Sequence, residues 1–556
     1  MMLHPILDID NFNVVLAVIS TYILLFGFIS LKIKQRWYLG EALPAFLTGV
    51  AFGPAAARFL KISQWTRDDS DGDHDVTYDL ARLVIGIQLV KVGYQLPKKY
   101  LKERFKEMTI CLLPLTAIGW LATSGCIMLM IPPCTDPILS QAIAKGPFAD
   151  NYVRRPLREF ISSEAGGNDG FGFPFLLLAV ALLRYAEAPE NTVSLEEFDL
   201  ARGIPDSLGT ADIGRFGGGV TRAMRHWAIE GVLYMMVLGS GYGALIGFVS
   251  RKLLNIASKR RWIDNECFSL MPVAVGLFIV GTCGCFGSDE TLACFVAGNA
   301  LNWDGLYHAE SQARHDAFNS TLETLLNFGT FMYLGAVMPW DQFHMPDTTG
   351  ITVWRLIALG FLILVFRRMP AILLGYRFMP KVCSNWKEAL FMGYFGPIGV
   401  GAIAYAEYTR RLFPAPGKSD REINNLTAAI TPVVYWLVLF SIIIHGLSVP
   451  ALNALYKIFK VPCICDHPVE VALLSENEPL PNNSTVDRGR HSMIVNNRFS
   501  RSPDDEEAQT RRSSRDDTEA ILRQSEESRS GGSADRPCTQ ESMQKVDRAV
   551  DTTEMV

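Results

Sequence analysis

The stretch Phe160–Phe175, with the sequence FISSEAGGNDGFGFPF, places two acids inside a run that is otherwise apolar enough to lie in a membrane. The acids are Glu164 and Asp169. A charged side chain at the centre of a bilayer costs roughly 2.5–3.5 kcal/mol on insertion scales, so it persists where it faces water, an ion or a partner charge. The stretch therefore predicts a membrane-spanning segment that lines a pathway for ions.

Apolar runs of similar length recur along most of the chain, and a helix needs about 20 apolar residues to span the hydrocarbon core. They predict an all-α polytopic membrane protein with about 12–13 transmembrane helices in a domain that covers residues 1–460. The expected spans are 12–31, 38–60, 78–97, 108–131, 132–145, 160–184, 224–249, 266–284, 289–305, 321–340, 352–376, 387–408 and 427–452.

The segment 461–556 differs sharply in composition from the rest of the chain. Long apolar runs end there, and Ser, Asp, Glu and Arg dominate, as in RRSSRDDTEAILRQSEESRSGGSADR. Such a segment has too little apolar surface to order itself, which predicts a disordered tail.

Lysine and arginine positions predict the orientation in the membrane. No basic residue precedes the first span, whereas Lys32, Lys34 and Arg36 follow it, so the positive-inside rule places the N-terminus outside. An odd number of spans then places the tail in the cytosol. Only the basic loop 409–421 falls on the outer side against the rule.

The first polar interruption of a span is Thr135-Asp136-Pro137. Proline removes a backbone donor and disfavours helical geometry in the preceding residue, so a broken helix is expected here. Broken helices build ion sites in secondary transporters. The span 132–145 is also short: about fourteen residues reach roughly 21 Å against a core of about 30 Å. Either the preceding spans rearrange or the sequence lacks a piece.

Further polar groups interrupt the spans. Asn168 shares a helix face with Glu164, while Asp169 lies about 100° further round, so the two acids can have separate roles. Asp289 and Glu290 begin another apolar run, as an entrance, as a second site or as a solvated helix start. A structural hydrogen-bonding role is the alternative for Asp169.

Two adjacent arginines, Arg367 and Arg368, end a further apolar run just before Pro370. One of them can be the buried partner of a carboxylate. The alternative is that both side chains reach the membrane surface. The lone His445 in the last span is expected to be structural.

These residues resemble those of the sodium/hydrogen exchangers of the cation/proton antiporter superfamily, and in particular the fungal plasma-membrane alkali-metal cation/proton antiporters. Six stretches in order carry the resemblance: TDPILSQAI (135–143), SSEAGGNDGFGFPF (162–175), GSDETLACFVAGNALNWDG (287–305), FRRMPA (366–371), FGPIGVGAIAY (395–405) and HGLSVP (445–450). The resemblance implies two inverted repeats, broken helices that cross at the midplane, an elevator-type motion and a homodimer.

The resemblance also implies roles for single residues. Asp169 would bind the monovalent cation or the proton, with Asn168 beside it and with Thr135 and Asp136 on the unwound crossing helix. Glu164 would pair with Arg367 or Arg368. Asp289 matches an acid of the fungal members, whereas Glu290 stands where they typically have a second aspartate.

The function expected from these features is secondary active antiport at the plasma membrane, in which cytosolic Na⁺, and also Li⁺ and K⁺, leaves in exchange for external H⁺. Salt tolerance and pH homeostasis would follow. The alternative is a transport-inactive membrane scaffold whose tail recruits cytosolic regulators. The sequence contains no His-Glu-x-x-His pair and no motif of a membrane protease, and we expect neither an enzyme nor a cofactor.

Overall fold

The computed structural model describes residues 11–60, 72–127, 140, 147–186, 214–313, 318–414, 419–461, 469–473, 484–487 and 492–496. Helices make up almost all of this part of the chain, as the apolar runs predict. Each expected span except 132–145 contains helix, although 38–60 is helical only over Ala42–Phe52 and 387–408 is interrupted. The sites predicted at Thr135 and Asp136, and most of the span 132–145, lie outside the described residues.

The helices of the first half end with α9, which contains the motif Phe160–Phe175. They are α1 Asn11–Leu31, the π-helical η1 Lys32–Arg36, α2 Ala42–Phe52, α3 Gly72–Gln95, α4 Tyr100–Glu103, α5 Phe105–Ile110, the π-helical η3 Cys111–Leu115, α6 Thr116–Ile127, α8 Pro147–Tyr152 and α9 Arg155–Arg184.

The helices of the second half fall into two groups. The first is α10 Gly219–His226, the π-helical η4 Trp227–Leu238, α11 Gly239–Lys259, α12 Asn265–Cys285, α13 Glu290–Leu301, α14 Leu306–Ala313 and α15 Phe318–Ala336. The second is the 3₁₀ segment η5 Trp340–Phe343, α16 Val353–Phe366, α17 Met369–Gly375, the 3₁₀ segment η6 Tyr376–Phe378, α18 Trp386–Tyr394, α19 Val400–Arg411 and α20 Arg421–Ile458.

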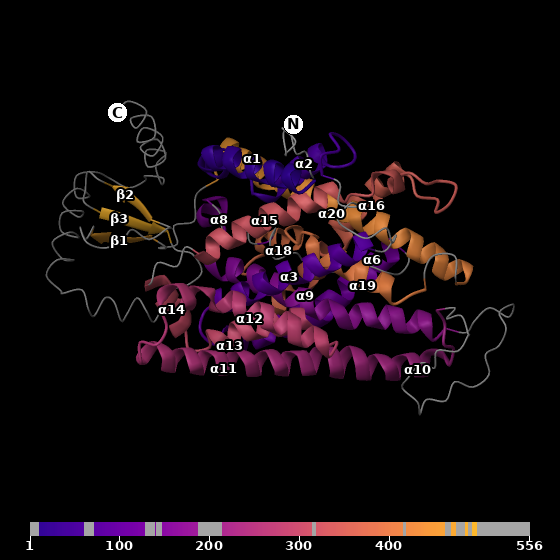
Figure 1. Cartoon of the computed structure of the whole chain (residues 1–556), viewed down its shortest axis with the longest axis horizontal. Coiled ribbons are helices and arrows are strands. Elements are labelled where there is room, and N and C mark those ends of the chain that lie inside the picture. Colours follow the sequence, from indigo (N-terminus) through magenta and orange to yellow (C-terminus); the bar gives the residue numbers. More distant parts are fainter. Residues whose placement is uncertain are drawn as a thin grey trace, which may run out of the picture.

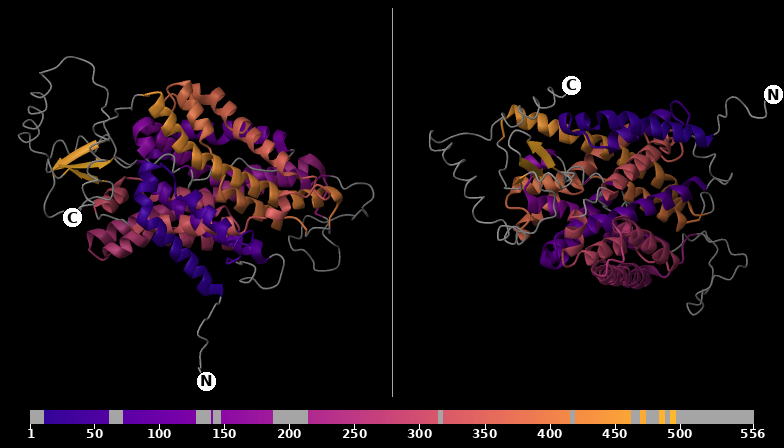
Figure 2. Two further views of the ribbon diagram at one scale, coloured as in Figure 1. Left: turned by 90° about the horizontal axis from the view of Figure 1, so that it is seen from above. Right: turned by 60° about the vertical axis from the view of Figure 1, so that its left-hand side comes forward.

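The helices form one bundle in which α9 is central. Helix α11 runs along one edge and α1 with α2 along the opposite edge (Figure 1 and the right panel of Figure 2). Within the described residues, seven helical stretches are long and apolar enough to cross a membrane. In the most apolar window of α9, 67% of the residues are buried, against 22% in the stretch Gly219–Lys259. Helix α9 is therefore largely enclosed by protein, whereas the apolar window within Gly219–Lys259 lies mostly at the surface of the bundle.

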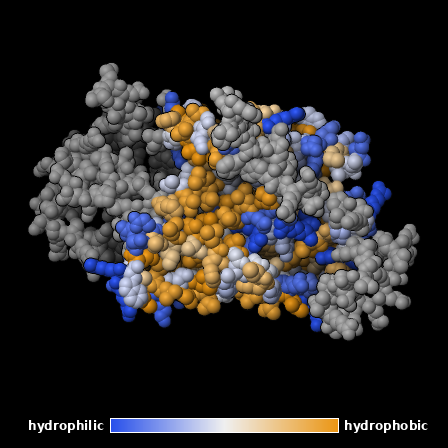
Figure 3. Space-filling view, viewed as in Figure 1, coloured by the Kyte–Doolittle hydropathy of each residue, from blue (hydrophilic) through white to orange (hydrophobic). Residues whose placement is uncertain are grey.

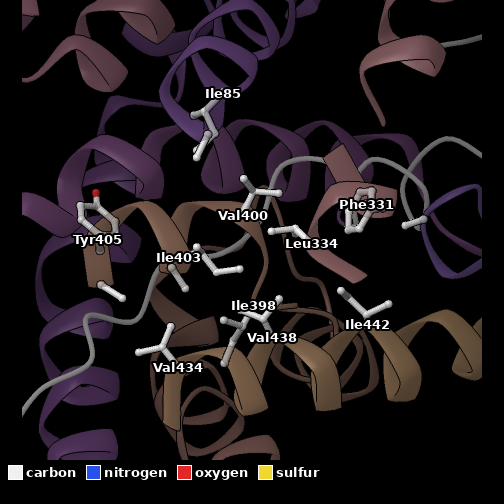
Figure 4. Packing of buried hydrophobic residues seen from close by; sticks show 14 of the residues in the cluster. Ile85, Phe331, Leu334, Ile398, Val400, Ile403, Tyr405, Val434, Val438 and Ile442 are labelled. Carbon is white, nitrogen blue, oxygen red and sulfur yellow. The ribbon is translucent and has the colours of Figure 1, made fainter. Parts of the chain in front are cut away.

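Apolar residues cover much of the middle of one face, beside a hydrophilic patch, and further hydrophilic residues lie toward the two ends of the long axis (Figure 3). This distribution is consistent with a membrane normal that runs along the long axis of the bundle. The interior is a continuous apolar cluster that joins α3, α15, α19 and α20 (Figure 4). Its members include Ile85, Phe331, Leu334, Ile398, Val400, Ile403, Val434, Val438 and Ile442.

The expected single span 387–408 is wrong, because the chain breaks into α18 and α19 with a non-helical segment, 395–399, between them. Its sequence, FGPIG, contains Gly396 and Pro397, which disfavour a continuous helix. The backbone groups that the break leaves without helical partners bond to side chains. The N–H of Ile398 donates to Ser441 Oγ (2.7 Å), and His445 Nε2 lies 3.0 Å from the carbonyl oxygen of Tyr394. Unwound backbone at membrane depth is stable only with such partners.

Replacing Ser441 by alanine should destabilise this break. The buried N–H of Ile398 would lose its acceptor, at a cost of about 1–3 kcal/mol. We expect a lower thermal unfolding temperature of the detergent-solubilised protein. The control is Ser30→Ala, because Ser30 is exposed and bonds only the carbonyl of Gly27 in its own helix (3.0 Å). Equal stability of the two variants would contradict the role of Ser441.

The basic loop 409–421, which conflicts with the positive-inside rule, has two arginines near its start that lie close to acidic side chains. Arg411 donates to Asp75 (2.6 Å), and Arg410 Nε lies 4.0 Å from Glu407. The expected order of spans places Asp75 and the loop 409–421 on the same, outer side. These ion pairs offset part of the local positive charge.

Part of the segment expected to be a disordered tail forms a small antiparallel sheet. Its strands are β1 Val469–Leu473, β2 Ser484–Asp487 and β3 Ser492–Asn496, in the order β1-β3-β2. The register pairs Val471 with Ile494 and Thr485 with Ile494. Short runs such as VEVAL and SMIVN are rich in β-branched residues, a local preference that the polar composition of the whole segment concealed.

Candidate ion-binding site

Helix α9 carries the three polar residues of the opening motif into the interior. Glu164, Asn168 and Asp169 are each 2–3% exposed, although the helix is long enough to cross a membrane. Asn168 Nδ2 donates to Glu164 Oε1, as expected for residues one turn apart on one face. Glu164 and Asn168 thus share one face of α9, as their spacing predicts, and Asp169 lies on another.

Arg368, rather than Arg367, is the partner of Glu164. Its Nη1 donates to Glu164 Oε1 (2.8 Å) and its Nη2 donates to Oε2, which gives a two-pronged ion pair. Arg367 instead donates to the backbone carbonyl of Gly396 in the break between α18 and α19. Both arginines lie inside the protein and do not extend to the membrane surface: Arg367 is 6% exposed and the side chain of Arg368 is 11% exposed.

The carboxylate of Asp169 lies against the first turn of α19. A Cβ atom on Gly401, the second residue of that helix, would be only 2.8 Å from Asp169 Oδ1. The N-terminus of a helix is a region of positive potential and favours an anion. The break before Val400 therefore places a helix end inside the bundle, beside the buried acid.

The backbone carbonyl of Asp169 accepts hydrogen bonds from two other helices. Thr291 on α13 donates its hydroxyl to this oxygen (3.1 Å), and Tyr405 on α19 donates to the same atom. Three helices thus meet at one residue. The buried carboxylate and the neighbouring hydroxyl groups supply oxygen atoms, which suit a small hard cation or a proton, while the helix N-terminus favours the ionised form of Asp169.

Helices α9 and α13 are in backbone contact just beside Asp169. A Cβ atom on Gly170 would lie 2.3 Å from the Cβ and 2.8 Å from the backbone nitrogen of Leu292. Only glycine fits at this position, which explains one of the glycines in the motif.

Substituting Gly170 by alanine should force α9 and α13 apart, because the new methyl group would meet the backbone and the Cβ of Leu292, which cannot turn aside. Overpacking of this kind costs about 1–3 kcal/mol. We expect a lower unfolding temperature in detergent. Gly241→Ala is the matched control, since a Cβ there meets nothing within 4 Å. An unfolding temperature of Gly170→Ala equal to that of the wild type would contradict this account.

The adjacent acids Asp289 and Glu290 have different partners. Asp289 caps α13: its Oδ1 accepts from the N–H groups of Thr291 and Leu292, at 3.0 Å each. Glu290 turns to α3 and pairs with Arg82, whose Nη2 donates to Oε2 (2.6 Å). The solvated helix start is wrong for both acids, since Asp289 is 1% and Glu290 7% exposed.

The family model described as sodium/hydrogen exchanger, transmembrane, matches residues 18–454 of the chain. The chain belongs to the sodium/hydrogen exchanger family. The match begins in α1, includes α9, α13 and α19, and ends in α20.

Curated relatives of this exchanger-family chain come from fungi. It is 34% identical over 467 residues to a probable Na⁺/H⁺ antiporter of Schizosaccharomyces pombe, covering 80% of this chain and 56% of that protein. It is 30% identical over 469 residues to a Na⁺/H⁺ antiporter of Saccharomyces cerevisiae, covering 80% and 44%. A further Schizosaccharomyces pombe Na⁺/H⁺ antiporter is 31% identical, with 80% and 91% covered. The chain thus spans about half the length of the first two relatives.

Among solved structures, the exchanger-family bundle is similar to the sodium proton antiporter MjNhaP1 from Methanocaldococcus jannaschii. The TM-score is 0.51 at 15% identity, over 80% of this chain and 97% of that chain. At this identity the similarity shows the fold alone. It confirms the predicted all-α polytopic class.

Sequence reasoning missed several residues that surround the acids. Arg82 is one of two basic residues, with Lys91, inside the span of α3, and a search for charges in spans would have found it. Thr291 follows two residues after Asp289, which is the ordinary pattern of a helix cap. Gly401 and Tyr405 lie in the stretch 395–405 that carries the resemblance, but the sequence gives neither residue a role, because their roles depend on contacts with α9.

Proposed function

We propose that the protein is a secondary active antiporter that exchanges cytosolic Na⁺, and also Li⁺ and K⁺, for external H⁺ at the plasma membrane. In the proposed role it contributes to salt tolerance and to pH and cation homeostasis. The observation that supports this most is the carboxylate of Asp169, buried between α9, α13 and α19.

The proposed mechanism follows from the burial of one carboxylate. An isolated buried charge is costly, so Asp169 is stable when a proton or a monovalent cation neutralises it. The two compete for the same oxygens, since each is repelled or displaced by the other. Asn168 would support the site, and the Glu164–Arg368 pair would hold the turn of α9. Thr135 and Asp136 are proposed to face the same site from the other broken helix.

Alternating exposure of a competitive site to the two sides produces exchange. Facing a more acidic exterior, Asp169 takes a proton and releases the cation; facing the cytosol, it takes a cation and releases the proton. We propose an elevator-type motion in a homodimer for this step. Asp289 and Glu290 are proposed as the entrance to the site.

Proton movement in lipid vesicles tests the proposal. The purified chain is reconstituted with a pH-sensitive dye inside, and Na⁺, Li⁺ or K⁺ is added outside. We expect each cation to drive proton movement that empty vesicles do not show. Absence of cation-dependent flux from folded protein would contradict antiport and favour the scaffold alternative, in which the tail recruits cytosolic regulators.

A further inference from the structure

The hydroxyl group of Thr291 lies between Asp169 on α9 and Asp289, the residue that caps α13. Its oxygen is 3.1 Å from the backbone carbonyl oxygen of Asp169 on α9 and 2.5 Å from Asp289 Oδ1 on its own helix. Both distances are within hydrogen-bonding range. Thr291 is 8% exposed, and Asp169 and Asp289 are more deeply buried, so water does not readily substitute for either bond.

A threonine hydroxyl has one hydrogen, whereas both of its neighbours are acceptors when Asp289 is ionised. The hydrogen can therefore serve only one of them at a time. A bond to an ionised carboxylate is roughly twice as strong as a bond between neutral groups. An anionic Asp289 takes the hydrogen, and a neutral Asp289 leaves it for the carbonyl of Asp169.

The second oxygen of Asp289 is where its charge can be neutralised. Oδ1 already accepts from two backbone N–H groups, whereas no group among the described residues hydrogen-bonds the buried Oδ2. A proton on Oδ2, or a cation beside it, weakens Oδ1 as an acceptor. The occupancy of Oδ2 then decides which way the hydroxyl of Thr291 points.

We propose that Thr291 is a positioning residue that couples the charge of Asp289 to the turn of α9 that carries Asp169, through the one hydrogen of its hydroxyl group. With Asp289 neutral, the bond to the Asp169 carbonyl ties α13 to α9. With Asp289 anionic, that bond is lost and the bond from Tyr405 to the same carbonyl remains. Because α9 and α13 are in backbone contact at Gly170 and Leu292, the turn has little freedom to compensate.

This inference deepens the proposed function, since it gives Asp289 an effect on the proposed ion-carrying residue. Its test does not need transport. The infrared band of protonated carboxylic acids is titrated in the purified full-length protein, and the contribution of Asp289 is assigned by its loss in Asp289→Asn.

Thr291→Val removes the hydroxyl with little change of shape. We expect the midpoint of the Asp289 band to move by about one pH unit toward alkaline pH, because the anionic form loses its hydroxyl donor. Thr291→Ser restores the hydroxyl and should return the midpoint to within a few tenths of a unit of the wild type. An unchanged midpoint in Thr291→Val would overturn the inference.

Tyr405→Phe tests the coupling itself. With one donor gone, the carbonyl of Asp169 competes more strongly for the hydrogen of Thr291, and the midpoint of Asp289 should move in the same direction. In the Thr291→Val background, Tyr405→Phe should leave the midpoint of Asp289 unchanged, as a double-mutant cycle requires for a coupling through Thr291. Equal shifts in both backgrounds would overturn the coupling. These results stand whether or not the vesicle assay shows antiport, so the two proposals fail separately.

Discussion

Asp169→Asn should abolish cation-dependent proton flux, lowering it at least about a hundredfold, to the level of empty vesicles. Asparagine keeps the shape of the side chain but can neither release a proton nor neutralise a bound cation. The surroundings of the residue are otherwise preserved, because Thr291 and Tyr405 bond its backbone carbonyl and not its side chain. The measurement is the initial rate of dye response after addition of Na⁺ or K⁺.

The matched control makes the same chemical change at the surface. Asp341 is exposed in η5, and Asp341→Asn should exchange ions at the wild-type rate. Both variants should unfold at the wild-type temperature in detergent. Flux retained in Asp169→Asn would remove this residue from the ion site and leave Asp289 or Asp136 as the carrier to be tested.

Arg368→Met should have the largest effect on stability. The Glu164 carboxylate would keep its bond from Asn168 but lose both bonds from the guanidinium group. Removing one partner of a buried ion pair leaves an uncompensated charge, at a cost of about 3–5 kcal/mol. We expect a large drop in the thermal unfolding temperature and poor recovery of folded protein.

The paired variant separates charge from packing. Glu164→Gln combined with Arg368→Met removes both charges and should recover most of the lost stability. Arg355→Met serves as the control, because Arg355 is exposed and donates to the carbonyl of Gly350 (2.7 Å). A double variant as unstable as Arg368→Met would show that the arginine acts through its contacts and not through its charge.

The acids of the site could be predicted from the chain alone because an apolar run reveals any charge that it contains. Glu164, Asp169 and Asp289 stand out in this way, and one-turn spacing already places Glu164 beside Asn168. Periodicity could not choose between Arg367 and Arg368, since neighbouring residues at the end of α16 point in different directions. The backbone path around the α18–α19 break decides that Arg368 reaches Glu164 while Arg367 reaches Gly396.

The partners of the two adjacent acids likewise could not be predicted from the sequence. Asp289 and Glu290 appear equivalent in sequence, but the first is the cap of α13 and the second is its first helical residue, so their side chains point toward different helices. The tail gives the opposite case: its overall composition predicted disorder, while short runs within it form strands.

The sequence by itself determined that this chain crosses a membrane many times and that a few buried acids interrupt its spans, because hydrophobic length and the cost of a buried charge are local properties. The partners of those acids were decided only by the tertiary structure. Arg82, Thr291, Gly401 and Tyr405 reach the site from three other helices. Contacts between helices depend on how the bundle packs, and no single stretch of sequence contains that information.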